Sequence, residues 1–335
     1  MTTILISLED HFLSPAVQAW QANESKNGAE SDVGIFPVNV FSDEVLRKFQ
    51  SLGNERLEDM ERAGIHLQIV SHGPTRRIPP AEICRQANDE LAAAVSRSGG
   101  RLRGFAMLPM EEPSAAAAEL SRCVEKLGFV GALINNLSDG GFYDDKRYWA
   151  VFDKAQQLDV PIYMHPAYPS GAMLDRYCGN FPDGAANAMS AWGWGWHSET
   201  ALHILRLFAS GLFDQYPRLK IIIGHDGEML PFQLDRIFPI STTWGPRTRS
   251  LKAVWDESIW ITTSGMFSLT PFKCLLNVSR KDHILFSVDY PFAKCEHGVE
   301  FMSEVKRKGI LTAEEFEMVA YKNAARLLKI KELEM

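Results

Sequence analysis

The chain has 335 residues, 46% hydrophobic and 23% charged, with a formal net charge of −7, which is ordinary globular usage. This acidic balance provides no basic surface for nucleic acid or an anionic membrane, so a small molecule is the favoured partner. The five cysteines are scattered without CxxC spacing, which predicts free thiols. The sequence shows no secretory signal and no stretch near the roughly 18–20 apolar residues of a membrane span, so we expect a cytoplasmic protein.

Eight short apolar runs predict eight β-strands along the chain. The runs are nearly continuous in Ile, Val, Leu and Phe, as is typical of strands buried on both faces, and helical patterns separate most of them. The predicted strands cover residues 4–8, 66–71, 102–108, 130–135, 160–164, 219–224, 259–264 and 283–288.

The helical patterns lie between these strands, at 43–64, 79–100, 112–128, 147–159 and 198–213. Eight strands alternating with helices predict a (β/α)8 TIM-type barrel that forms a single domain over residues 1–335. A doubly wound open sheet is the alternative, but its Gly-rich fingerprint is absent from the sequence. Two connections, 12–42 and 166–197, are longer than ordinary βα loops, and we expect them to form pocket walls.

Reactive residue types follow four of the eight predicted strands. In a barrel of this kind the chemistry lies at the C-terminal ends of the strands, and side chains two residues apart on a strand point to the same side. One such residue alone is weak evidence, because a single histidine at a strand end is usually structural. Together they predict a metal site. The residues are Glu9 and His11 after strand one, His165 after strand five, His225 and Glu228 after strand six, and Asp289 after strand eight.

We expect this site to hold one ion rather than two. A two-metal site normally needs a bridging group, and the end of strand four, residues 134–136, reads Ile-Asn-Asn. Mixed oxygen and nitrogen ligands suit Zn²⁺ or Mn²⁺, with one position left for substrate or water. The expected ligands are Glu9, His11, His165 and Asp289.

Two further histidines have open roles. His72 follows strand two and is within possible reach of the site, although packing is the simpler interpretation. His197 follows a tryptophan-rich segment, 192–196, and either lines a pocket or starts a helix.

Six stretches are characteristic when taken together: LEDHF, LGFVGALINN, LDVPIYMHP, ALHILRLFASGLFDQYPRLKIIIGHDGE, WITTSG and ILFSVDYPF. They resemble the amidohydrolase-related (ACMSD-like) metal-dependent decarboxylases of ortho-hydroxylated aromatic acids. Within that family the pattern is most similar to the γ-resorcylate (2,6-dihydroxybenzoate) decarboxylases. The resemblance extends from about residue 4 to residue 330, nearly the whole chain.

The resemblance implies the same four metal ligands and adds further roles. It implies that His225 and Glu228 form an acid/base-tuning pair, that Arg236 binds the substrate carboxylate, and that Phe292 lies against the aromatic ring. It also implies a homodimer or homotetramer. Asp226 departs from the family pattern, since relatives usually carry an apolar residue there, and the two long connections match the family least.

The predicted activity is therefore that of a carboxy-lyase. We expect non-oxidative, reversible decarboxylation of a small aromatic acid such as a dihydroxybenzoate, with ring protonation by Asp289 and with a divalent ion as the cofactor. The alternative enzyme is a mononuclear metal-dependent hydrolase or hydratase acting on a lactone, amide or dienoate, because one barrel supports many chemistries. A barrel that only binds ligands is the non-enzymatic alternative. The tryptophan-rich segment favours an aromatic substrate.

Overall fold

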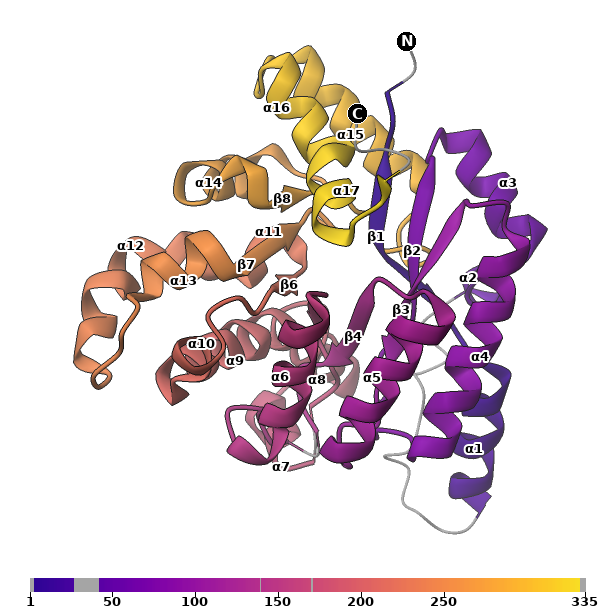
Figure 1. Cartoon of the computed structure of the whole chain (residues 1–335), viewed down its shortest axis with the longest axis horizontal. Coiled ribbons are helices and arrows are strands. Elements are labelled where there is room, and N and C mark those ends of the chain that lie inside the picture. The colour runs from indigo at the N-terminus through magenta and orange to yellow at the C-terminus, as the bar shows by residue number, and fades with distance from the viewer. Residues whose placement is uncertain (1–2, 27–41, 139, 170, 332–335) are drawn as a thin grey trace.

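Eight parallel strands form a nearly closed barrel in the computed structural model, which describes residues 3–26, 42–138, 140–169 and 171–331. Each strand pairs with the next one along the chain, and helices surround the strands (Figure 1). All eight predicted strands are confirmed, and so is the TIM-type barrel. The strands are β1 Ile6–Phe12, β2 Leu67–His72, β3 Leu102–Met107, β4 Gly131–Asn135, β5 Ile162–His165, β6 Ile221–Ile223, β7 Ile259–Thr262 and β8 Ile284–Leu285.

The helices follow the predicted order with two differences. The pattern over 43–64 forms two helices, because the chain is extended at Ser51 and Gly53 between them, and the helix predicted at 198 begins earlier, at Gly195. The helices are α1 Pro15–Lys26, α2 Asp43–Gln50, α3 Asn54–Ala63, α4 Ala81–Arg97, α5 Pro113–Leu127, α6 Trp149–Leu158, α7 Gly171–Leu174, α8 Asp183–Ser190, α9 Gly195–Ser210, α10 Leu212–Gln215, α11 His225–Glu228, α12 Leu230–Ile240, α13 Leu251–Ser258, α14 Leu269–Val278, α15 Cys295–Arg307, α16 Ala313–Glu317 and α17 Asn323–Leu328.

The apolar core has two layers, which explains why the strand sequences are apolar on both faces. Alternate strand side chains fill the barrel interior, among them Ile69, Phe105 and Ile222, and α17 packs against this layer. The intervening side chains, such as Val70 and Ile134, pack outward against the helices. The barrel is therefore a packed core rather than a pore, which leaves the C-terminal ends of the strands as the place for a site.

Serine side chains, together with a backbone bridge between Asp10 and Tyr290, close the barrel between β1 and the chain that follows β8. The backbone N–H groups of Leu8 and Glu9 donate to Ser287 Oγ at 3.1 and 2.7 Å, and the Val288 N–H donates to Ser7 Oγ at 2.9 Å. On its other side β1 shifts its register against β2 between Ser7 and Asp10. These contacts hold the end of β1 next to the chain that follows β8.

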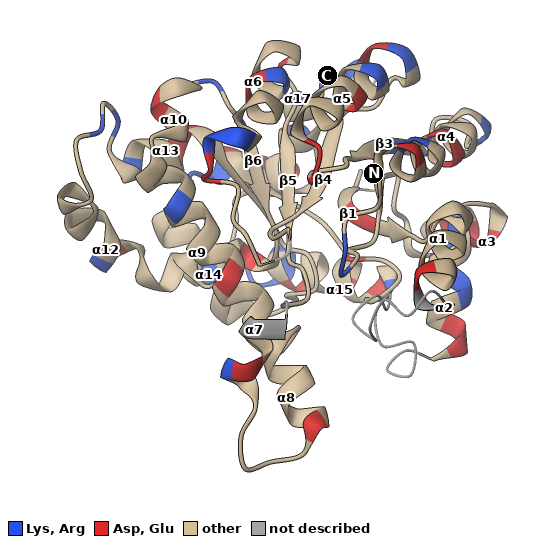
Figure 2. Cartoon of the chain, turned by 90° about the horizontal axis from the view of Figure 1, so that it is seen from below, with Lys and Arg blue, Asp and Glu red and all other residues tan. Residues whose placement is uncertain are grey.

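The two long connections differ in how much of them is described. The first, 12–42, contains α1, while its residues 27–41 lie outside the described part of the chain. The second, 166–197, carries α7 and α8, and α8 projects from the barrel (Figure 2). Acidic and basic residues are interspersed over the outer helices (Figure 2). Among the described residues, no helix has the length and apolarity needed to cross a membrane.

Replacing the closing serine tests this account of the barrel. Ser287→Ala removes the acceptor of two buried N–H groups, and we expect the free energy of unfolding to fall by about 2–6 kcal/mol, since each unsatisfied buried group costs about 1–3 kcal/mol. Urea denaturation measures the change. Ser303→Ala, which removes an exposed hydroxyl that donates to the Val299 carbonyl within α15, is the control. Equal stability of the two variants would contradict serine-mediated closure.

Candidate metal centre

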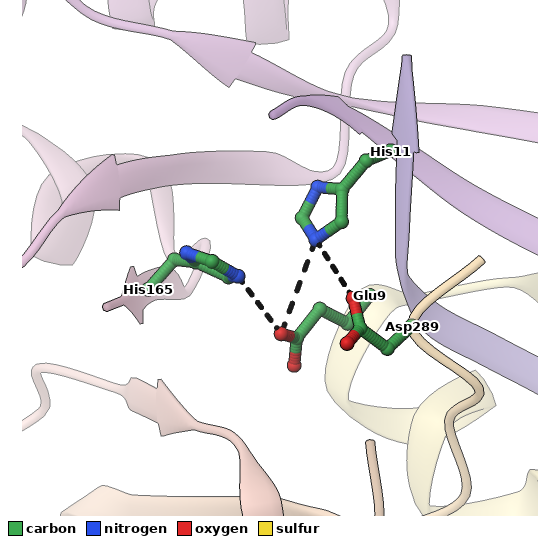
Figure 3. A group of neighbouring side chains, drawn as sticks. All are labelled: Glu9, His11, His165 and Asp289. Carbon is green, nitrogen blue, oxygen red and sulfur yellow. Dashed lines mark ion pairs between the residues drawn. The ribbon is translucent and has the colours of Figure 1, made fainter. Parts of the chain in front are cut away.

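Four side chains converge at the C-terminal ends of the strands (Figure 3). Glu9 and His11 belong to β1, His165 is the last residue of β5, and Asp289 follows β8. One ligand-type atom of each lies within 4.8 Å of the others. His165 Nε2 is 3.0 Å from Glu9 Oε1, and His11 Nε2 is 3.4 Å from Asp289 Oδ1 and 3.9 Å from Glu9 Oε1. The structure thus brings together the four residues that the sequence predicts as ligands.

Contacts behind the cluster orient each of these side chains. The Tyr163 hydroxyl donates to Glu9 Oε2, so the other carboxylate oxygen, Oε1, faces the cluster. His165 Nδ1 donates to the Pro166 carbonyl at 2.7 Å, because a carbonyl can only accept, and its Nε2 is left for a ligand. His11 Nδ1 is hydrogen-bonded to the Ser71 hydroxyl at 3.1 Å, which likewise leaves Nε2 directed at the cluster. Hydrogen bonds of this kind fix the tautomer and direction of metal-binding side chains.

Close packing also explains the glycine that follows β6. A Cβ at Gly224 would lie 2.8 Å from Glu9 Oε2 and 3.1 Å from the Tyr163 hydroxyl. Any other residue would displace this carboxylate–phenol contact. Gly224 is therefore required by the geometry of Glu9.

Three atoms at the centre of the cluster make no hydrogen bond to any described residue: Glu9 Oε1, His11 Nε2 and Asp289 Oδ1, all of them buried. Burial acts to raise the pKa of Glu9, but His225, His11 and His165 together hold it well below its usual value. Burial acts to lower the pKa of His11, yet Asp289 and Glu9 raise it to about 9. Buried polar atoms normally have partners, and this set of oxygen and nitrogen donors fits a divalent cation such as Zn²⁺ or Mn²⁺.

A second group of side chains lies beside the first, on an unusual turn. Every residue from His225 to Met229 has a positive φ, between 52° and 93°. Left-handed backbone costs about 1–2 kcal/mol for each residue other than glycine and is concentrated at functional sites. The turn brings His225 Nδ1 within 2.8 Å of Glu228 Oε1, and His225 Nε2 lies 3.8 Å from Glu9 Oε1. The predicted pairing of His225 with Glu228 is therefore present, next to the four-residue cluster.

The charges of this pair reinforce one another. Burial acts to lower the pKa of His225, whereas Glu228 and Glu9 raise it to about 10. Burial acts to raise the pKa of Glu228, whereas His225 and His197 lower it to about 2. Asp226, between them, is 3% exposed, and neither of its carboxylate oxygens has a hydrogen-bond partner among the described residues.

The two histidines with open roles have different surroundings. His197, in the first turn of α9, has its Nδ1 2.6 Å from Glu228 Oε2, a contact that its sequence position did not indicate. His72 is buried beside the Phe12 ring and its Nδ1 donates to the Gly73 carbonyl at 2.7 Å. It belongs to neither group of clustered side chains.

An aromatic cluster adjoins the four residues. The Phe292 ring is 5.8 Å from that of His11, and the Trp196 ring is 6.4 Å from that of His165. Arg236 is exposed on α12 and contributes to none of these clusters, so its placement gives no support to the predicted carboxylate contact. The aromatic cluster consists of Leu13, Phe49, Tyr168, Ala191 and Trp196, with Phe292 packed against it.

Carboxylates and histidines converge at the ends of the first, fifth and eighth strands of this (β/α)8 barrel. This arrangement is typical of metal-dependent hydrolase-like barrels. The amidohydrolase family model matches residues 56–330, and the chain belongs to this family.

The chain is similar to several known decarboxylases. The protein named Decarboxylase orsB, from Emericella nidulans, is 47% identical over 335 residues, which cover 98% of each chain. A γ-resorcylate decarboxylase from a Polaromonas species is 36% identical over 328 residues, covering 91% of this chain and 95% of that protein. These relatives confirm the predicted family and the carboxy-lyase class.

A solved structure supports the predicted cofactor. It is a dihydroxybenzoic acid decarboxylase from Polaromonas sp. JS666 with bound manganese and the inhibitor 2-nitroresorcinol. Its TM-score is 0.84 at 32% identity, and the match covers 99% of this chain and 100% of that one. The manganese bound in this neighbour and the four-residue cluster of this chain both support a divalent metal ion as the cofactor.

Filling the space at Gly224 tests how the cluster is held. In Gly224→Ala the new methyl group displaces Glu9, and we expect affinity for Mn²⁺ to fall about 10- to 100-fold, as it does when contacts behind a ligand are lost. Equilibrium dialysis with metal analysis measures the affinity. Gly184→Ala, at a position with no atom within 4 Å of the added Cβ, is the matched control. Unchanged affinity in Gly224→Ala would show that Glu9 does not depend on this packing.

Proposed function

We propose that this protein is a metal-dependent, non-oxidative decarboxylase of an ortho-hydroxylated aromatic acid, such as a dihydroxybenzoate. The observation that carries the proposal is the set of three buried ligand atoms without hydrogen bonds, lying next to an aromatic cluster. The similarity to decarboxylases over nearly the whole chain supports it.

In this proposal Glu9, His11, His165 and Asp289 hold one Zn²⁺ or Mn²⁺ ion. The bound ion supplies Lewis acidity, which stabilises negative charge on the substrate oxygens. Tyr163 keeps Glu9 Oε2 occupied so that Oε1 is presented to the ion.

The aromatic cluster would position the substrate ring. Phe292 and Trp196 lie beside two of the proposed ligands, and aromatic rings pack favourably against one another while excluding water. Leu13 comes from the connection 12–42, and Tyr168 and Trp196 come from 166–197. We accordingly propose that both connections form walls of the substrate site within one barrel domain.

Asp289 would deliver the proton. Its carboxyl donates a proton to the ring carbon that bears the carboxylate, the carbon–carbon bond then breaks, and CO₂ leaves as the ring regains aromaticity. Burial raises the pKa of Asp289, whereas His11, His225 and a bound divalent ion act to lower it, so the proton reaches Asp289 within the reaction and is passed directly to the ring carbon. His225, held by Glu228, would hold or return a proton at Nε2, the nitrogen on the side of Glu9. Temporary loss of aromaticity is the costly step, so the site must stabilise the protonated ring more strongly than the substrate.

Carbon dioxide release tests the reaction. Protein loaded with Mn²⁺ or Zn²⁺ is incubated with a panel of aromatic 2-hydroxy acids, and we expect metal-dependent CO₂ release from at least one of them. Removal of the ion by a chelator, or Asp289→Asn, should abolish release. No CO₂ from any acid, with cleavage of a lactone, amide or ester by the same metal-loaded protein, would contradict the decarboxylase and favour a hydrolase.

Truncation of an aromatic side chain tests the substrate site. In Phe292→Ala the ring next to His11 is lost, and we expect KM to rise about tenfold, which corresponds to the ~1.4 kcal/mol of a lost aromatic contact. Phe232→Ala, which truncates a side chain that is 81% exposed on α12, is the matched control and should leave KM unchanged. If KM in Phe292→Ala equals that of the control, the substrate ring does not bind against Phe292.

A further inference from the structure

We infer that His197 is a positioning residue, which ties the turn carrying His225 and Glu228 to α9 and to the connection before it. The inference rests on the proposed function, because it assigns His197 an effect on the proposed acid/base pair. His197 does not touch the four-residue cluster and acts through Glu228.

Glu228 is fully buried and both of its carboxylate oxygens are occupied. Oε1 is 2.8 Å from His225 Nδ1, and Oε2 is 2.6 Å from His197 Nδ1. The two imidazole rings are 4.8 Å apart and inclined by 70°. Since each oxygen has its own donor, the carboxylate has one defined orientation, and the imidazole of His225 is oriented with it.

The strained turn explains why an anchor outside it is needed. His225 and Glu228 are both members of the left-handed stretch from His225 to Met229, so the bond between them cannot hold that stretch against the rest of the barrel. His197 belongs to α9, a helix of 16 residues that packs in the outer layer. Its bond to Glu228 is therefore a side-chain link that can keep the turn in its strained conformation.

The second ring nitrogen of His197 defines its chemistry. His197 Nε2 lies 3.2 Å from the Trp192 carbonyl, and both this carbonyl and the Glu228 carboxylate only accept hydrogen bonds. The imidazole therefore bridges the Glu228 carboxylate and the connection that precedes α9, which fixes the plane of the ring as well as its position.

His197 also lies at the start of α9, where neighbouring residues approach both the four-residue cluster and the pair of His225 and Glu228. The preceding residue, Trp196, packs 5.2 Å from the Tyr168 ring and 6.4 Å from the His165 ring. The start of α9 packs closely against the end of α8, because a Cβ at Gly195 would collide with the Ser190 carbonyl. Two successive residues of α9 thus contact a proposed metal ligand and the acid/base pair.

The same three side chains offer a second interpretation, since His197, His225 and Glu228 are close enough to surround an ion. Ligands at 2.0–2.1 Å from a tetrahedral ion lie about 3.3 Å apart. The observed separations of 2.6 and 2.8 Å are those of charge-assisted hydrogen bonds. Hydrogen bonding is therefore the arrangement that these distances favour, and the number of ions bound per chain separates the two cases.

Two variants of His197 test the inference. His197→Leu removes the donor to Glu228, and we expect kcat to fall about 10- to 100-fold with KM changed by less than about twofold, since the effect is on the acid/base pair rather than on substrate binding. His197→Asn places an amide N–H near the position of Nδ1 and should recover most of the loss. Ser198→Ala, which removes a hydroxyl that donates to the Gly195 carbonyl within α9, is the control in the same turn. Every variant should bind one metal ion per chain.

Two further readouts separate positioning from loss of fold. In a Glu228→Gln background, His197→Leu should add little, because its partner is already altered. In the zinc-loaded wild-type protein, imidazole protons bonded to Glu228 should give proton NMR signals downfield of the amide region, and His197→Leu or His197→Asn should remove one of them. This signal does not depend on activity, so it tests the inference even if no aromatic acid releases CO₂, which would be a failure of the proposed function alone.

Three results would overturn the inference. The first is a wild-type kcat in His197→Leu. The second is a His197→Asn variant that keeps its fold and metal but is as slow as His197→Leu. The third is two bound ions per chain in the wild type with no downfield imidazole signal, which would make the three side chains a second metal site.

Discussion

The convergence of Glu9 Oε1, His11 Nε2 and Asp289 Oδ1, three buried atoms that make no hydrogen bond to described residues, is the constraint on which the rest of the site depends. Two carboxylates and an imidazole in this arrangement form a donor set that suits a divalent cation. The barrel brings them together from opposite ends of the chain, because the serine contacts between β8 and β1 place Asp289 beside Glu9 and His11. The contacts that close the barrel are therefore also the contacts that bring the candidate metal ligands together.

Backbone strain is the second feature of the site. Positive φ angles occur at Asp289 and throughout the turn from His225 to Met229, so three of the proposed functional side chains come from left-handed backbone. Such conformations persist only where neighbouring contacts enforce them. Tyr163 and Gly224 hold Glu9, and Glu228 is held between His225 and His197. The geometry of the site therefore depends on side chains that lie behind the reactive groups and fix their positions.

The sequence was sufficient to predict the barrel and the positions of the proposed ligands. Continuous apolar runs identify buried strands, and residues such as His165 and Asp289 are conspicuous because they follow such runs directly. The left-handed turn at His225 could not be predicted, because non-glycine residues enter this conformation only under tertiary contacts. The same holds for His197, whose partner Glu228 is 31 residues away, and for closure by Ser7 and Ser287, which are 280 residues apart. The exposure of Arg236 is what a charged residue on a helix commonly shows, and the carboxylate contact was implied by the family resemblance alone.

The central claim is that one divalent ion lies among Glu9, His11, His165 and Asp289. Anomalous X-ray scattering at the manganese absorption edge, from crystals of the Mn²⁺-loaded protein, tests it most directly. The account predicts one strong anomalous peak per chain, within coordination distance of these four side chains. A peak among His197, His225 and Glu228 instead, or no peak at the ends of β1, β5 and β8 in fully loaded protein, would contradict it.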